Sequence, residues 1–182
     1  DHLTDITFKE NNFFINGNGK FLIQKNFDKI SYRIKKKDDE YLFDAKLDFI
    51  KNPINLKFLN YKSDDNSKVS LKLDGKLNKN KTLNLENIRF ENNSDLISLK
   101  NFELTNDLKI SGLKSAIFDY TDIQKKKNSF QAKQNGEKFI ISGKTFNASK
   151  LIEDLIFEDT KNKDIFDKNY YFKIDLDEVY LH

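Results

Sequence analysis

The stretches Leu83–Phe90 (LNLENIRF) and Ile97–Leu104 (ISLKNFEL) decide the fold of this chain. In each, two apolar residues alternate with polar ones, two other positions follow, and then two more alternating apolar residues. Alternation is typical of a β-strand with one apolar and one polar face. In a regular strand, the extra residue in the middle would turn the second apolar pair to the opposite face. Each stretch therefore predicts a β-bulge that keeps all its apolar side chains on one side of a bent strand.

The same pattern recurs elsewhere in the chain. A third copy is Ile174–Leu181 (IDLDEVYL), and a looser fourth copy is Ile54–Tyr61 (INLKFLNY). The chain opens on Leu3, Ile6 and Phe8, which we interpret as the end of a truncated copy. Repetition of one strand unit favours a sheet that is built by adding similar strands side by side.

Alternating residues without an extra position fill much of the remaining sequence. The longest runs are Tyr41–Phe49, Val69–Asp74 and Phe172–Asp177, and turn-forming Asn, Gly, Asp and Ser residues separate the runs. Strands of this kind belong to antiparallel sheets with one face in water. We predict a mainly β protein, a twisted and curved antiparallel sheet that forms either an open groove or a partly closed barrel.

One segment near residues 147–158 has a different period. Its apolar residues follow the i, i+3, i+4, i+7 and i+8 spacing of an amphipathic helix, and they are Ala148, Leu151, Ile152, Leu155 and Ile156. Asn147 or Ser149 can cap its N-terminus. We therefore predict one short amphipathic helix here, packed on the sheet as a cover.

Composition excludes several kinds of chemistry. The 182 residues include no Cys, and the only His residues are His2 and His182, so we expect no Ser–His–acid triad, no metal centre and no cofactor. Paired acids such as Asp64–Asp65 lie in polar, turn-like sequence, and we expect no enzyme. The net charge of +3 combines 32 basic and 29 acidic residues, and almost all the basic ones are Lys. Because nucleic-acid readers depend on Arg, we expect no nucleic-acid partner.

The length predicts a single β-rich domain over residues 1–182. The sequence starts at Asp1 and contains no Met. Together with the truncated first copy, this indicates an excised segment of a longer repetitive β-groove protein.

Two stretches near the C-terminus resemble the AsmA-like superfamily, and in particular its YhdP-type branch. They are Phe139–Leu155 (FIISGKTFNASKLIEDL) and Tyr170–Leu181 (YYFKIDLDEVYL), and the resemblance extends over residues 69–182. The positions that match are Gly143, Phe146, Asn147, Leu151, Leu155, Ile174, Leu176 and Val179. Asn147 stands where the superfamily usually has Asp, and no Arg-Pro pair follows it.

The resemblance implies a fragment of a bridge-like lipid transfer protein that moves phospholipid between the inner and outer membranes of a Gram-negative bacterium. It further implies a periplasmic location, a parent protein anchored in the inner membrane outside this fragment, and no catalysis. The partners would be phospholipid acyl chains and neighbouring segments of the same parent chain. An alternative is a structural or surface β-protein without a transport role, either adhesin-like or a closed lipocalin-like barrel.

The candidate lipid-groove residues are the apolar members of the repeat, which the bulges would place on one face. They are Leu71, Leu73, Leu83, Leu85, Ile88, Phe90, Ile97, Leu99, Phe102, Leu104, Ile174, Leu176 and Val179. Each would act by burying apolar surface against an acyl chain, at about 0.8 kcal/mol per buried methylene.

Overall fold

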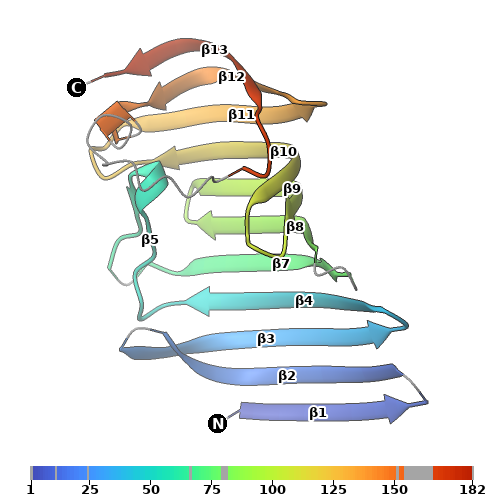
Figure 1. Cartoon of the computed structure of the whole chain (residues 1–182). Helices are drawn as coiled ribbons and strands as arrows, with labels where there is room; N and C mark the ends of the chain where they lie inside the picture. Colours follow the sequence, from blue (N-terminus) through green and yellow to red (C-terminus); the bar gives the residue numbers. More distant parts are fainter. Residues whose placement is uncertain are drawn as a thin grey trace.

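The computed structural model describes residues 2–10, 12–23, 25–65, 67–78, 82–150, 152–153 and 166–181. Within them, eleven strands form one sheet in which chain order is also spatial order (Figure 1). The first strands of the sheet are β1 (His2–Lys9), β2 (Asn12–Ile23), β3 (Asn26–Lys37), β4 (Glu40–Phe49), β7 (Val69–Leu77) and β8 (Leu83–Asn92). The others are β9 (Asp95–Leu104), β10 (Ile110–Thr121), β11 (Lys127–Asn135), β12 (Lys138–Asn147) and β13 (Tyr171–Tyr180).

The sheet is antiparallel with a single exception. Every strand from β1 to β12 runs opposite to its neighbour, whereas β13 runs parallel to β12. The sheet is not closed, because β1 and β13 lie at opposite ends of the strand order. The predicted mainly β, antiparallel sheet is therefore confirmed in its open form, and a closed lipocalin-like barrel is wrong.

The strand register contains the bulge predicted for LNLENIRF. Leu73 pairs with Ile88, but Gly75 pairs with Leu85, which leaves Glu86 as the extra residue of β8. Strand β9 pairs with β8 without a shift, and its own extra position is Asn101, at a positive φ of 46°. The two apolar pairs of each strand consequently lie on the same face, as the sequence predicts.

The looser fourth copy, Ile54–Tyr61, does not form a bulged strand of the sheet. It folds into the two-residue strands β5 (Asn55–Leu56) and β6 (Tyr61–Lys62) around the 3-10 turn η1 (Lys57–Leu59). Asn60 ends this turn in the left-handed conformation, with a φ of 52°. The chain reverses there, so the apolar residues of this copy cover the sheet instead of extending it.

The short helix predicted near residues 147–158 is not supported. Asn147 is the last residue of β12, and after it the backbone N–H of Ile152 donates to the carbonyl oxygen of Ala148 at 2.9 Å. Residues 151 and 154–158, which include Leu151, Leu155 and Ile156, lie outside the described residues.

The hydrophobic core lies at one margin of the sheet, beneath the connection between β4 and β7. We call this connection, residues 50–68, the cover segment. Its Leu59 and Tyr61 pack against a patch of buried residues from five strands of the sheet, which are Phe49, Val69, Phe90, Ile97 and Tyr120. The rings of Tyr61 and Phe90 meet edge to face, with centroids 5.5 Å apart. This packing gives one side of the sheet its only fully buried apolar cluster among the described residues.

Candidate functional site

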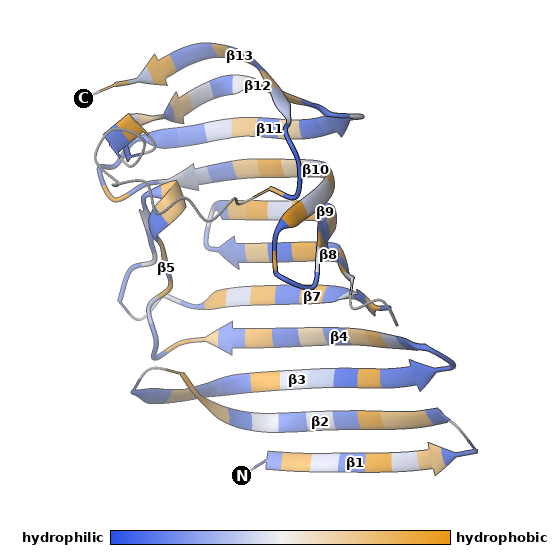
Figure 2. Ribbon diagram, in the orientation of Figure 1, coloured by the Kyte–Doolittle hydropathy of each residue, from blue (hydrophilic) through white to orange (hydrophobic). Residues whose placement is uncertain are grey.

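One row of residues crosses the whole sheet on the side that carries the cover segment. Paired position by position, the row runs Thr4, Gly17, Tyr32, Ala45, Leu73, Ile88, Leu99, Ala116, Ala132, Ile141 and Ile174. We call this side of the sheet the apolar face. The opposite side, which carries Lys72, Arg89 and Ser98 at paired positions, is the polar face. Apolar residues recur as bands on neighbouring strands (Figure 2).

The structure places all the sequence-predicted groove residues on the apolar face. Ten of them form rows across β7, β8 and β9, and these are Leu71, Leu73, Leu83, Leu85, Ile88, Phe90, Ile97, Leu99, Phe102 and Leu104. The remaining residues, Ile174, Leu176 and Val179, lie on the edge strand β13, opposite Ile141, Gly143 and Phe146 of β12. Strands β10, β11 and β12 separate the two groups, and the row through Ala116 and Ala132 connects them.

These predicted residues differ in how far they are open to a ligand. Phe90 and Ile97 are buried in the core under the cover segment, so their apolar surface is already used by the protein itself. Leu73, Leu85 and their neighbours on β7–β9 are half-buried, while Ile174 and Val179 on β13 are exposed. The part of the face that a ligand can contact is therefore its central and outer rows.

The cover segment is held to the sheet by buried polar contacts. The side-chain amide of Asn92 donates to the hydroxyl of Tyr61 at 2.7 Å, and the hydroxyl of Tyr120 donates to the carbonyl oxygen of Leu59 at 3.0 Å. Burial raises the pKa of Tyr61 to about 12, and the nearby carboxylate of Asp95 adds to the rise despite the opposing hydrogen bond from Asn92. Burial also raises the pKa of Tyr120. Both phenols thus stay neutral and hydrogen-bonded at neutral pH.

The start of the cover segment is anchored by one buried carboxylate, Asp28 of β3. Its Oδ1 accepts the backbone N–H groups of Ile50 at 2.9 Å and Lys51 at 3.0 Å. Its Oδ2 accepts both the backbone N–H and the side-chain amide of Asn52, at 3.2 Å and 2.7 Å. Burial alone would raise the pKa of Asp28, but these donors outweigh it and lower the pKa below the usual 3.8.

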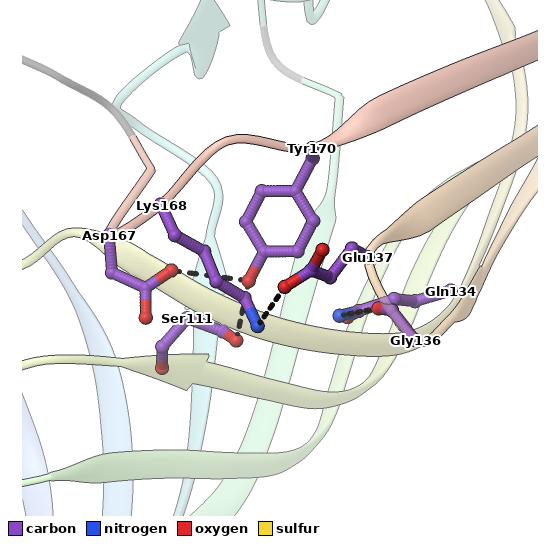
Figure 3. Close-up of polar contacts among 7 residues, drawn as sticks. All are labelled: Ser111, Gln134, Gly136, Glu137, Asp167, Lys168 and Tyr170. Carbon is purple, nitrogen blue, oxygen red and sulfur yellow. Dashed lines mark hydrogen bonds and ion pairs between the residues drawn. The ribbon is translucent and has the colours of Figure 1, made fainter.

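A second segment, residues 166–170, reaches from β13 back to the beginning of β10, and we call it the strap. The backbone N–H of Asp167 donates to the carbonyl oxygen of Ile110, and the hydroxyl of Tyr170 donates to that of Ser111 at 2.9 Å. Figure 3 shows Tyr170 pointing toward Ser111 beside an exposed ion pair between Lys168 and Glu137. The strap occupies the place next to Ile110 where β10 has no pairing with β11.

The strap contributes Phe166 and Tyr170 to an aromatic cluster that the sequence did not predict. The rings of Phe139 and Phe172 stack at 5.3 Å, and Phe166 and Tyr170 contact Phe139 at 6.0 and 5.1 Å. Phe139 and Phe172 belong to alternating runs that predict strands, but Phe166 stands in a polar stretch with no periodic pattern. Only the tertiary structure brings this ring to the apolar face.

The polar face presents charges of both signs. Nε of Arg33 donates to both carboxylate oxygens of Asp44, at 2.9 and 3.0 Å, and Arg89 pairs with Glu91. A shallow hollow on this face is lined by Arg33, Asp44 and Lys72 among others. Because the signs are mixed and the pairs lie at the surface, this face is typical of a solvated sheet surface.

The described residues contain no group of three or more His, Asp or Glu side chains placed to hold a metal ion. None of their helical segments is long and apolar enough to cross a membrane. No family model, curated protein or solved structure matches the chain, so the comparisons do not identify the AsmA-like superfamily. The fold and the site together define a class of protein, in which an open, mostly antiparallel sheet has one apolar face that is covered at its margins.

Proposed function

We propose that this protein binds the acyl chains of phospholipid on its apolar face and carries out no catalysis. One observation carries the proposal: the row from Thr4 to Ile174 continues across all eleven strands without a break in pairing, and from Ala45 onward every member of it is apolar. Along this row and its neighbours, apolar side chains such as Leu85, Leu99 and Phe102 are only half-buried. A continuous apolar surface of this kind lowers its free energy by contact with an apolar partner.

An acyl chain fits such a surface better than a compact ligand does. The described residues place the cover segment on one margin of the face and the strap at the beginning of β10. A long, flexible apolar chain can lie along the rows between them, whereas its charged headgroup would stay in water at the rim. Each methylene removed from water would contribute about 0.8 kcal/mol.

The wider setting follows from the resemblance to the AsmA-like superfamily and belongs to the same proposal. The chain would be a periplasmic segment of a bridge-like protein, anchored in the inner membrane of a Gram-negative bacterium by a part outside this sequence. It would move phospholipid toward the outer membrane along its apolar face. Neighbouring segments of the parent chain would be further partners.

Organic-solvent extraction of the gently purified protein, followed by mass spectrometry, tests the proposal. We expect co-purified phospholipid, and a protein that repeatedly yields none after purification without detergent contradicts the proposal.

A photo-crosslinking pair tests which face makes the contact. Phe172 on the apolar face and Phe27 on the polar face are 51% and 56% exposed, so they form a matched pair. We would replace each with benzoylphenylalanine and irradiate it with vesicles of phosphatidylethanolamine and phosphatidylglycerol. Lipid adducts at Phe172 but not at Phe27 support the proposal, and equal labelling of both refutes it.

A further inference from the structure

Within the described part of the chain, both end strands of the sheet leave one side of their backbone without a pairing strand. Among the residues that the structure describes, β1 pairs only with β2, and β13 pairs only with β12. Monomeric β-proteins usually protect such edges with short strands, prolines, bulges or inward-pointing charges. Here β1 is a regular strand of eight residues and β13 a strand of ten, and neither contains proline.

The edges also expose apolar side chains on the same face of the sheet. Ile6 and Phe8 of β1 are 54% and 76% exposed, and Phe172 and Ile174 of β13 are 51% and 62% exposed. Ile6 continues the row of Ile15 and Ile34, and Ile174 ends the row through Ile141. A further strand added at either edge would bury these side chains in a continuation of the apolar face.

Strand direction makes the two edges complementary to each other. The alternation from β1 to β12 sets β12 antiparallel to β1, and β13 runs parallel to β12. β13 therefore runs opposite to β1. If two copies stand end to end in the same orientation, β13 of one copy meets β1 of the other in the antiparallel arrangement that the sheet interior uses.

The side chains of the two edges fit this arrangement in one register. When Phe172 is set opposite Ile6, both side chains lie on the apolar face. Antiparallel counting then sets Lys173 opposite Asp5 on the polar face. Opposite charges directly across a strand pair stabilise it, and apolar pairs add burial. The same two strands thus supply both apolar and charge complementarity.

We propose that β13 of one copy of this chain pairs with β1 of a second copy, which joins copies head to tail into one continuous sheet. The interface is heterologous and leaves a free β1 and a free β13 at the two ends, so it can add further copies. The apolar face of each copy then continues onto the next. This inference does not depend on lipid binding, because it rests on the two edges alone.

Single cysteines test the pairing directly, since the native chain contains no Cys. D5C and K173C would be purified separately, mixed and oxidised. We expect a disulfide-linked dimer from the mixture and little from either variant alone. As a control, K133C replaces an exposed lysine on the polar face of β11, which is paired on both sides, and its mixture with D5C should give no dimer. Efficient dimer formation by D5C alone or K173C alone indicates symmetric edge pairing and overturns the proposal.

Sedimentation of the native chain over a range of concentrations supplies the second test. We expect the mean mass to rise with concentration, and I174K to weaken association by about tenfold or more. I117K is the matched control, because Ile117 is 48% exposed but lies on the interior strand β10. A native chain that stays monomeric at every concentration, or equal effects of I174K and I117K, overturns the proposal.

Discussion

Replacing Asp28 with Asn is expected to loosen the cover segment while the sheet stays folded. In the native protein each carboxylate oxygen of Asp28 accepts two hydrogen bonds, from Ile50 and Lys51 on one side and from Asn52 on the other. An Asn keeps one accepting oxygen and turns an NH2 group toward the other pair of donors. Hydrogen bonds to a charged group contribute about 1.5–3 kcal/mol each, and buried donors without an acceptor add a desolvation cost. We therefore expect D28N to lose about 3 kcal/mol of unfolding free energy.

Urea unfolding at several pH values measures this loss, with D44N as the matched control. Asp44 also accepts two hydrogen bonds, but from Arg33 at the surface, so D44N should change stability by less than about 1 kcal/mol. The pKa of Asp28 is lower in the folded state than its usual 3.8. The stabilising effect of the Asp28 carboxylate is thus fully present above pH 3.8 and is lost as the pH falls through the folded-state pKa. The difference in unfolding free energy between the native protein and D28N should shrink in that acid range. Equal stability of D28N and D44N, or a difference that does not depend on pH in this acid range, would refute the reasoning.

Three further substitutions, with G136A and Y171F as controls for two of them, test contacts around the apolar face. G75A should lower the free energy of unfolding, measured by thermal unfolding, by about 2 kcal/mol, because its Cβ would lie 2.1 Å from the backbone oxygen of Asn84. The control G136A should lower it by only about 1 kcal/mol, because nothing lies within 4 Å of the new Cβ and only the φ of +61° is unfavourable. Y61F should cost about 1–2 kcal/mol, because it leaves the buried amide of Asn92 without its acceptor. Folding raises the pKa of Tyr61 from its usual 10.0 to about 12. The stability that depends on its neutral phenol is therefore complete below pH 10 and is lost as the pH rises toward 12. Phenolate absorbance should follow that loss, and ionisation of Tyr61 in the native protein at pH 10 would contradict this prediction. Y170F should speed amide exchange at Asp167 and destabilise the strap by about 1 kcal/mol, whereas Y171F, at an exposed residue, should do neither.

Local sequence patterns predicted the strands well where each strand packs by one face. In Leu83–Phe90 and Ile97–Leu104 the extra residue was sufficient to predict both the bulge and the shared face, because side-chain direction along a strand follows from counting positions. The same counting failed for Ile54–Tyr61. Its apolar spacing resembles the other copies, but the chain reverses at Asn60 and packs Leu59 and Tyr61 onto a core formed by distant strands.

The sites that hold the face together were not predictable from the sequence. Asp28 is an ordinary Asp in the sequence, and its role depends on the backbone N–H groups of Ile50, Lys51 and Asn52, which the pairing of β3 with β4 brings beside it. The strap is a similar case. Phe166 stands in a polar stretch, and it reaches the aromatic cluster because β10 leaves an unpaired edge at Ile110.

The sequence by itself determined that this protein is a β-sheet with one continuous apolar face, since alternation and bulges are local properties of the chain. Only the tertiary structure decided which part of that face stays open. Phe90 and Ile97 belong to the same repeat as Leu85 and Leu99, yet the cover segment buries the first pair and leaves the second half-buried. The parallel direction of β13, which makes the two sheet edges complementary, is also a tertiary property. Strand pairing joins residues far apart in the sequence, and no local pattern specifies where a returning segment will pack.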